Sequence, residues 1–303
     1  MYSIKRILVA LDLSELDEML IAYAANMAEI LATEKVYFFH VAKSLELPER
    51  VSEKYPDLLA PLDESLRNDL TKKIDAQFKA ACDYQIEIKE GNPADQIMRW
   101  SDIKEIDLIM VGRKLQLRGQ GVLPGKLARV AHCSVLFVPE NSQPKIDKIV
   151  IPVDFSRNSN LALEMALEFK KATSSQLILQ NTYTVPWGYH SLGKSYEEFA
   201  EIMKEHAHED AIQFLKRKDI DESSITLELS LDKEESPAER AYEIATKHSA
   251  DLVIMSSKGR SGIAQLLLGS VAEKMIKLDA TIPLMVVKNK NDNMGFFEAL
   301  MKI

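Results

Sequence analysis

The segment 256–270, which reads SSKGRSGIAQLLLGS, has the composition of a phosphate-binding loop. Its three glycines would let the backbone approach a ligand closely, and the helix predicted to follow offers N–H groups that favour an anion. Lys258 and Arg260 add positive charge, and Ser270 offers a hydroxyl group. Glycines are also common in ordinary loops, and Ser270 could serve only as a helix cap. The spacing alone therefore leaves both phosphate binding and a plain loop open.

Asp154 is a second candidate for chemistry, because it directly follows the apolar run Ile149–Val153. A carboxylate there could hold a base or a metal ion, although the sequence fixes no second carboxylate near it. The chain contains neither a G-x-S-x-G nucleophile motif nor an H-E-x-x-H metal motif. We therefore predict no catalytic constellation, and we expect no Walker A phosphate loop.

Histidines and aromatic residues elsewhere in the second half are weaker candidates. His206 and His208 lie about 200° apart on a predicted helix, so surface positions are favoured over a metal pair. Trp187, Tyr189 and His190 follow the predicted strand 177–181. They could line a ligand pocket or pack a long loop against the core.

The elements that must position these residues occur twice. Residues 5–12 read KRILVALD and residues 147–154 read DKIVIPVD, while 106–112 (IDLIMVG) is matched by 250–256 (ADLVIMS). Both pairs are separated by about 140 residues, near half the length of the chain, which indicates two copies of one domain. We predict domains at 1–140 and 147–290, joined by the polar segment 140–146.

Each half alternates short apolar strands with amphipathic helices. This alternation predicts an α/β fold with a five-stranded parallel sheet and helices on both faces. In the common doubly wound order 3-2-1-4-5, strands 1 and 4 are neighbours, and ligands bind at their carboxyl ends. That order would bring Asp154 and the loop after Met255 into one crevice. In the first half we expect strands at 7–11, 36–41, 85–89, 107–111 and 135–138. The helices expected there begin at the Ser14-x-x-Asp17 signal, span 62–81, and begin at Asn92-Pro93. In the second half we expect strands at 149–153, 177–181, 225–231, 252–255 and 284–287, and helices that begin at 158, span 196–218, begin at Pro237 and begin at 266.

Composition restricts the class of protein. The formal charge of −8 argues against a general nucleic-acid or anionic-membrane surface. The two cysteines, Cys82 and Cys133, form no CxxC pair, so a buried free thiol is favoured over a disulfide or zinc site. The N-terminus lacks the features of a signal peptide, and no apolar run is long enough to span a bilayer. We expect a cytoplasmic protein with no nucleic-acid or membrane partner.

At these two segments the chain resembles the universal stress proteins. Nucleotide-binding members carry G-x2-G-x9-G-S/T after strand 4, and residues 256–270 match this pattern except that Ser256 replaces the first glycine. The family also has an aspartate in a P-x-D-x-S context after strand 1, which Pro152–Ser156 matches. The resemblance covers the whole chain as a tandem pair and implies two domains of the adenine nucleotide alpha hydrolase-like fold.

The resemblance implies an adenine nucleotide, ATP with or without Mg²⁺, in the second domain. Asp154 would contact adenine or ribose, Thr182 would contribute backbone to the base, and Lys258 would face the triphosphate. Gly259, Gly269, Ser270 and Val271 would hold the phosphates. The full expected site is Pro152, Asp154, Thr182, Met255, Ser256, Lys258, Gly259, Gly269, Ser270 and Val271.

The first half departs from this pattern. Gly112 is present, but Leu115 stands where the second glycine should be, and Gly125-Lys126 lacks the hydroxyl. Using Gly121 instead makes the loop too short. Asp12 keeps its place, with Ala10 in place of the proline. Arg113, Lys114 and Arg118 could attract an anion, but a solvated basic loop is favoured.

Three hypotheses follow for the function. The first is a tandem universal stress protein that binds ATP in its second domain and acts as a sensor or scaffold in the stress response. The second is a nucleotide-free interaction scaffold with both sites decayed, and the third is a slow ATP hydrolase. Expected partners are the nucleotide, an unknown protein and a second copy of the chain in a homodimer.

Overall fold

The computed structural model describes residues 3–44, 62–114, 122–232, 236–259, 268–278 and 281–289. The chain divides into two compact units, with the division between Pro144 and Lys145. We call them the first and second domains and describe each by itself.

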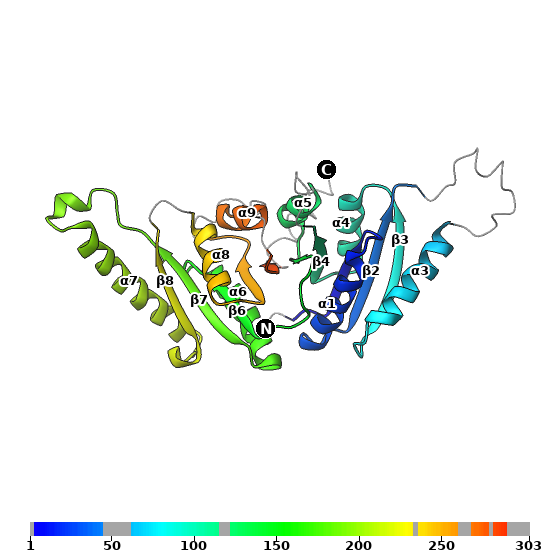
Figure 1. The fold of residues 1–303 in the computed structure, drawn as a ribbon, viewed down its shortest axis with the longest axis horizontal. Helices are drawn as coiled ribbons and strands as arrows, with labels where there is room; N and C mark the ends of the chain where they lie inside the picture. Colours follow the sequence, from blue (N-terminus) through cyan, green and yellow to red (C-terminus); the bar gives the residue numbers. More distant parts are fainter. Residues whose placement is uncertain are drawn as a thin grey trace. The chain divides into compact units, whose positions relative to one another are not determined.

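The first domain is a five-stranded parallel sheet with helices on both faces (Figure 1). Its strand order is β3-β2-β1-β4-β5, which confirms the predicted doubly wound arrangement. Helix α1 packs on β1 and β4 and contacts α3, while α4 packs on β2 and contacts α5. The elements are β1 (Arg6–Leu11), α1 (Leu16–Ile30), β2 (Lys35–Ala42), α3 (Leu62–Gln77), β3 (Asp83–Glu90), α4 (Pro93–Ile103), β4 (Leu108–Arg113), α5 (Val122–Val130) and β5 (Ser134–Pro139).

The second domain repeats this architecture, again with an all-parallel set of pairings and the order β10-β9-β6-β7-β8. Helix α6 packs on β6 and β9, α7 on β7 and β8, and α8 on β6 and β7. The elements are β6 (Lys148–Pro152), α6 (Ser159–Thr173), β7 (Gln176–Tyr183), the 3-10 turn η1 (Tyr189–Leu192), α7 (Tyr196–Lys216), η2 (Glu222–Ser224), β8 (Thr226–Leu231), α8 (Pro237–Lys247), β9 (Leu252–Ser256), α9 (Ser270–Lys277) and β10 (Leu284–Val287).

Central strands are buried on both faces, as their near-continuous apolar sequences predict. Ile7, Leu8 and Val9 of β1 are inaccessible to solvent, and so are Ile149 and Val150 of β6. Burial of these side chains stabilises each sheet by about 1.5–3 kcal/mol per residue. The carboxyl end of each sheet is therefore a fixed frame for the loops that follow it.

Helix starts show which sequence signals were reliable. Asn92 caps α4 through N–H groups of Ala94 and Asp95, and Ser236 forms a capping box with Glu239 at the start of α8. Pro93 and Pro237 follow these caps, as predicted.

Other expected boundaries were wrong. Asp17 does not help to start α1: its carboxylate instead accepts the N–H groups of Asp12 and Leu13, because it points back at the end of β1. Helix α3 ends at Gln77 rather than 81, and α9 begins at Ser270 rather than 266. No helix within the described residues is long and apolar enough to cross a membrane.

Candidate functional site

A pocket of about 290 Å³ lies at the carboxyl ends of β6, β7 and β9, where α9 begins. It is at the switch point of the sheet, since β6 pairs with β7 on one side and with β9 on the other. All ten residues of the sequence-predicted site line it: Pro152, Asp154, Thr182, Met255, Ser256, Lys258, Gly259, Gly269, Ser270 and Val271.

Asp154 is held in a fixed position at one wall of the pocket. Its Oδ1 accepts hydrogen bonds from the Ser156 N–H (3.0 Å) and the Ser159 hydroxyl (2.7 Å). The same Ser159 oxygen accepts the N–H of Asp154 at 3.2 Å. A Cβ atom on Gly259 would lie 2.7 Å from Asp154 Oδ2, so glycine lets the loop pass close to this carboxylate.

Two hydrogen bonds hold the loop after β9, one of them within its first residues and one that joins its two ends. The Ser256 hydroxyl donates to the Lys258 carbonyl oxygen (2.7 Å), and the Gly269 N–H donates to the Ser257 carbonyl oxygen (2.8 Å). Ser256, the departure from the family pattern, is therefore used inside the loop, and it is 9% exposed. Residues 260–267, including Arg260 and Gly262, lie outside the described residues.

The start of α9 faces this pocket. Gly269 is the N-cap residue and makes no side-chain capping bond, and Ser270 is the first helical residue. Ser270 is therefore not the cap, and the alternative in which it is only a cap is wrong. N–H groups in the first turn of a helix have no partner inside the helix, which makes this end suited to an anion.

Several pocket residues were missed by sequence reasoning. Asn181 donates to the Val153 carbonyl oxygen (2.8 Å), and Gln180 donates to the Thr182 hydroxyl (2.8 Å). Ser159 is the third, through its bonds to Asp154. Asn181 and Ser159 each occupy the position matched by a polar residue in the first domain, His40 and Asp17, so position-by-position comparison of the repeats carried that signal. Pro237, Ser257 and Ala272 also line the pocket.

The equivalent place in the first domain is different. Its cavity of about 200 Å³ contains Leu16 beside Gly112, and a Cβ atom on Gly112 would lie only 2.5 Å from Leu16 Cδ2. Asp12 Oδ2 accepts a bond from Lys114 Nζ at 2.9 Å. The predicted departure of this site from the pattern agrees with that packing.

The residues weighed for a first-domain phosphate site are described only in part. Gly125 lies inside helix α5 instead of at its cap. Arg113 is 8% exposed at the end of β4, so the expectation of a solvated residue was wrong there. Leu115, Arg118 and Gly121 lie outside the described residues.

The remaining candidates lie away from the pocket. His208 Nε2 is 3.3 Å from Glu222 Oε1, and the described residues contain no cluster of three or more metal-ligating side chains. Tyr189 packs against Tyr196 of α7, which fits the loop-packing alternative. Trp187 is 99% exposed and fits neither alternative. Within the described part of the chain, both Cys82 and Cys133 are free thiols.

The prediction that the chain carries no Walker A phosphate-loop pattern was wrong. Residues 188–195 read GYHSLGKS, which fits G-x4-G-K-S before a helix. In the structure this segment contains the 3-10 turn η1, and Ser195 forms a capping box with Glu198 at the start of α7. The serine hydroxyl is thus engaged, and Glu197 and Glu198 in the first turn repel an anion.

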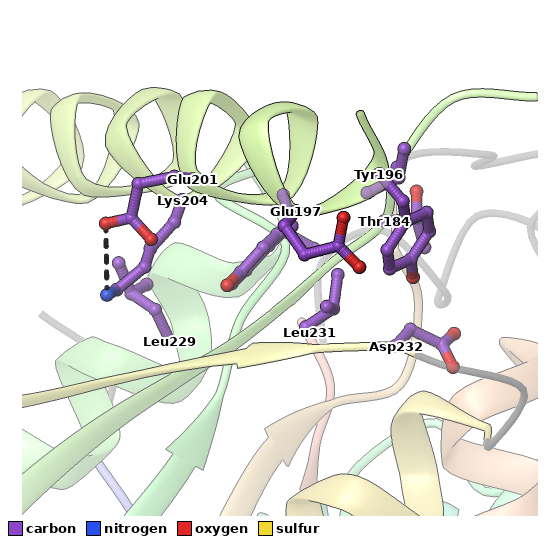
Figure 2. Close-up of a pocket in the computed structure, with 11 residues that line it drawn as sticks. Thr184, Tyr196, Glu197, Glu201, Lys204, Leu229, Leu231 and Asp232 are labelled. Atoms are coloured by element: carbon purple, nitrogen blue, oxygen red, sulfur yellow. Dashed lines mark hydrogen bonds and ion pairs between the residues drawn. The ribbon is translucent and has the colours of Figure 1, made fainter. Parts of the chain in front are cut away.

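A wider groove of about 1030 Å³ lies beside this segment, between α7 and the strands β7 and β8. Figure 2 shows Glu197, Glu201 and Asp232 around it, with Glu201 paired to Lys204 at 3.3 Å. The balance of charge is acidic, so this groove disfavours phosphate. None of the ten predicted residues lines it.

Comparison with known proteins agrees with the fold and the duplication. The universal stress protein family profile matches twice, at residues 3–139 and 145–288. A universal stress protein of Methanocaldococcus jannaschii is 29% identical over 157 residues, covering 48% of this chain and 96% of the relative. A second from the same organism is 34% identical over 149 residues, covering 49% and 85%. A solved universal stress protein from Archaeoglobus fulgidus DSM 4304 shares the fold, with a TM-score of 0.61 and 17% identity over 93% of this chain and 98% of that one. The chain therefore belongs to the universal stress protein family, as a tandem pair of its domains.

Proposed function

We propose that the second domain binds an adenine nucleotide, ATP, and that the tandem chain acts in the stress response as a nucleotide-dependent sensor or scaffold. The observation that carries this proposal is the convergence of all ten predicted residues on one pocket at the switch point of the sheet. They come from β6, β7, β9, α9 and the adjoining loops, so their meeting depends on the fold and not on closeness in sequence.

The base and ribose would occupy the side of the pocket near β6 and β7. The Asp154 carboxylate, whose Oδ1 is held by Ser156 and Ser159, would contact a ribose hydroxyl or the adenine amino group. Backbone groups at Thr182 would meet the edge of the base. Asn181 supports this wall by fixing the end of β6 through the Val153 carbonyl.

The phosphates would lie against the start of α9. Gly259 and Gly269 keep the loop backbone close, and the N–H groups of Ser270 and Val271 are at the helix end that favours negative charge. Lys258 adds a cation to the same wall.

Binding without rapid turnover is the expected chemistry. Among the described residues that line the pocket, Asp154 is the one carboxylate, and Ser156 and Ser159 fix it. A hydrolase would need a group placed to orient the attacking water. Mg²⁺, when bound with ATP, would neutralise phosphate charge, and Asp154 is the pocket's acidic oxygen ligand for it.

A nucleotide-free scaffold is the second candidate function, favoured by Ser256 in place of the first glycine of the pattern. The bond from Ser256 into its own loop weakens this argument, because the hydroxyl helps to hold the loop that would bind the phosphates. A cytoplasmic location, a homodimer of tandem chains and an unidentified protein partner remain part of the proposal.

The test is to measure the nucleotide content of freshly purified protein by mass spectrometry, followed by calorimetric titration of the emptied chain with ATP. One adenine nucleotide per chain is the expected stoichiometry. Two would contradict the degenerate first domain. No bound nucleotide and no heat with ATP would reject ATP binding and leave the scaffold function.

A further inference from the structure

The cavity of the first domain has its own chemistry, separate from any nucleotide in the second. It occupies about 200 Å³ at the carboxyl ends of β1, β2 and β4. Its walls are mostly apolar, and they include Leu16, Leu20, Phe39, Ile97 and Leu123. Such a lining favours an uncharged ligand over a phosphate.

The acidic groups on this wall already have partners. Asp17 is 2% exposed, and its two oxygens accept the N–H groups of Asp12 (3.1 Å) and Leu13 (2.9 Å). Asp12 accepts from the Ser14 N–H (3.1 Å) and from Lys114 Nζ (2.9 Å). These carboxylates shape the rim of the cavity and are not its open hydrogen-bonding group.

His40 supplies that group. Its side chain lines the cavity and is 7% exposed, and its Nδ1 lies 2.9 Å from the Leu11 carbonyl oxygen. A carbonyl oxygen only accepts, so Nδ1 carries the hydrogen and the neutral ring presents Nε2 as an acceptor. No group within the described residues bonds Nε2. Nε2 is therefore an acceptor that a ligand in the cavity can bond in place of water, which favours a ligand with a hydrogen-bond donor.

We propose that the first-domain cavity binds a small, uncharged ring compound that donates one N–H or O–H group to His40 Nε2. The cavity is smaller than the 300–1,000 Å³ or so typical of drug-sized ligands, which limits the compound to about one or two rings. Leu16 lies against Gly112 and fills the space at the end of β4. A phosphate group would need open backbone at this place. This inference does not depend on nucleotide binding in the second domain.

The test compares indole with 1-methylindole, two probes of nearly equal shape of which only indole has an N–H donor. Binding to the full-length chain is measured by calorimetry and by NMR of ¹⁵N-labelled histidine, at about pH 8 so that a typical imidazole is neutral. We expect saturable binding of indole, a change in the His40 Nε2 resonance, and about fivefold weaker binding of 1-methylindole.

His40→Asn is the matched variant, because the second domain has Asn181 at this position and bonds the same strand-end carbonyl with it. It should weaken indole binding about fivefold and leave 1-methylindole unchanged. Equal weakening of both probes would reject the proposed hydrogen bond.

Two further variants locate the bound probe. Ala10→Leu should abolish binding by filling the cavity, while Gly259→Trp, in the second-domain pocket, should leave it intact. Circular dichroism confirms that each variant is folded. Absence of saturable indole binding to the wild-type chain, or its survival in folded Ala10→Leu, would overturn the proposal.

Discussion

The two pockets occupy the same place in two copies of one fold, yet they retain different parts of a common design. In both, the N–H of the aspartate after the first strand is bonded by the residue five positions later, Asp17 in one domain and Ser159 in the other. In both, a side chain from the next strand bonds the carbonyl that ends the first strand: His40 on Leu11, and Asn181 on Val153. The hydrogen bonds that hold the strand ends are therefore present in both domains, although different residues line the two pockets.

One difference between the two pockets is an exchanged pair of residues. The first domain has Leu16 against Gly112, whereas the second has Asn158 and Ser256 at the matching positions. Asn158 Nδ2 donates to the Gly259 carbonyl oxygen at 3.1 Å, and so supports the loop that Leu16 would exclude. This exchange adds to the other differences between the two pockets, among them Leu115 in place of the second glycine and Lys126 in place of the serine.

The largest expected effect comes from filling the second pocket. Gly259→Trp should weaken ATP binding about a hundredfold or more, because the new side chain collides with Asp154 and occupies the phosphate wall. Gly125→Trp is the control in the first domain, where no atom lies within 4 Å of the added Cβ. Calorimetry on both variants checks this, and normal ATP binding by folded Gly259→Trp would show that the site is elsewhere.

Next in size is the exchanged pair itself. Gly112→Ser should destabilise the chain by about 2 kcal/mol, because its Cβ overlaps Leu16. Adding Leu16→Asn should restore most of that loss by giving the first domain the second domain's pair. Urea denaturation of Gly112→Ser, of Leu16→Asn and of the double variant gives a double-mutant cycle for the free energy of unfolding. If the two changes are simply additive, the contact does not govern the difference between the pockets.

A smaller effect distinguishes the two phosphate-loop sequences of the second domain. Lys258→Ala should weaken ATP binding about tenfold, since a cation is removed from the pocket wall. Lys194→Ala, in the GYHSLGKS segment, should leave the affinity unchanged. The reverse pattern in a calorimetric titration would move the nucleotide to the start of α7.

The smallest expected effect concerns a glutamate on the edge strand of each domain and the cation that it pairs with. Glu228 of β8 bonds His248 Nε2 (2.6 Å) and Lys247 Nζ (3.1 Å) beside helix α8, whereas Glu87 of β3 bonds Lys89 of its own strand. Burial raises the pKa of Glu228, but the bonds from His248 and Lys247 outweigh it and lower the pKa below its ordinary 4.5.

A lowered carboxyl pKa adds stability above the unfolded pKa that is lost as the pH falls through the folded pKa. Wild type should therefore lose stability relative to Glu228→Gln as the pH falls below about 4.5, by less than about 1 kcal/mol because solvent screens the pair. Urea denaturation from pH 7 to pH 3 measures the difference, with Glu87→Gln as the matched control. A pH-independent difference would contradict the assigned ion pair.

The sequence predicted the repeat from its period and the parallel sheets from the hydrophobic pattern, and the strand order is the common one for such sheets. The ten residues that meet in the second pocket were implied by the resemblance to the universal stress proteins. It did not predict the roles of Asp17, His40 or Leu16. Those roles depend on side-chain direction at the end of a strand, which no local pattern encodes. Asp17 resembled a helix-start residue by spacing, yet its carboxylate bonds backwards to β1.

The Leu16–Gly112 contact also imposes an order on evolutionary change between the two kinds of pocket. A chain with serine at the end of the fourth strand and asparagine at the start of the first helix can lose the serine side chain first, because this creates space and removes only the serine's bond within its own loop. Gaining leucine first would force it against a Cβ atom at a separation near 2.5 Å. A drift from the open pocket to the closed one thus passes through the glycine intermediate, and the return path must first remove the leucine.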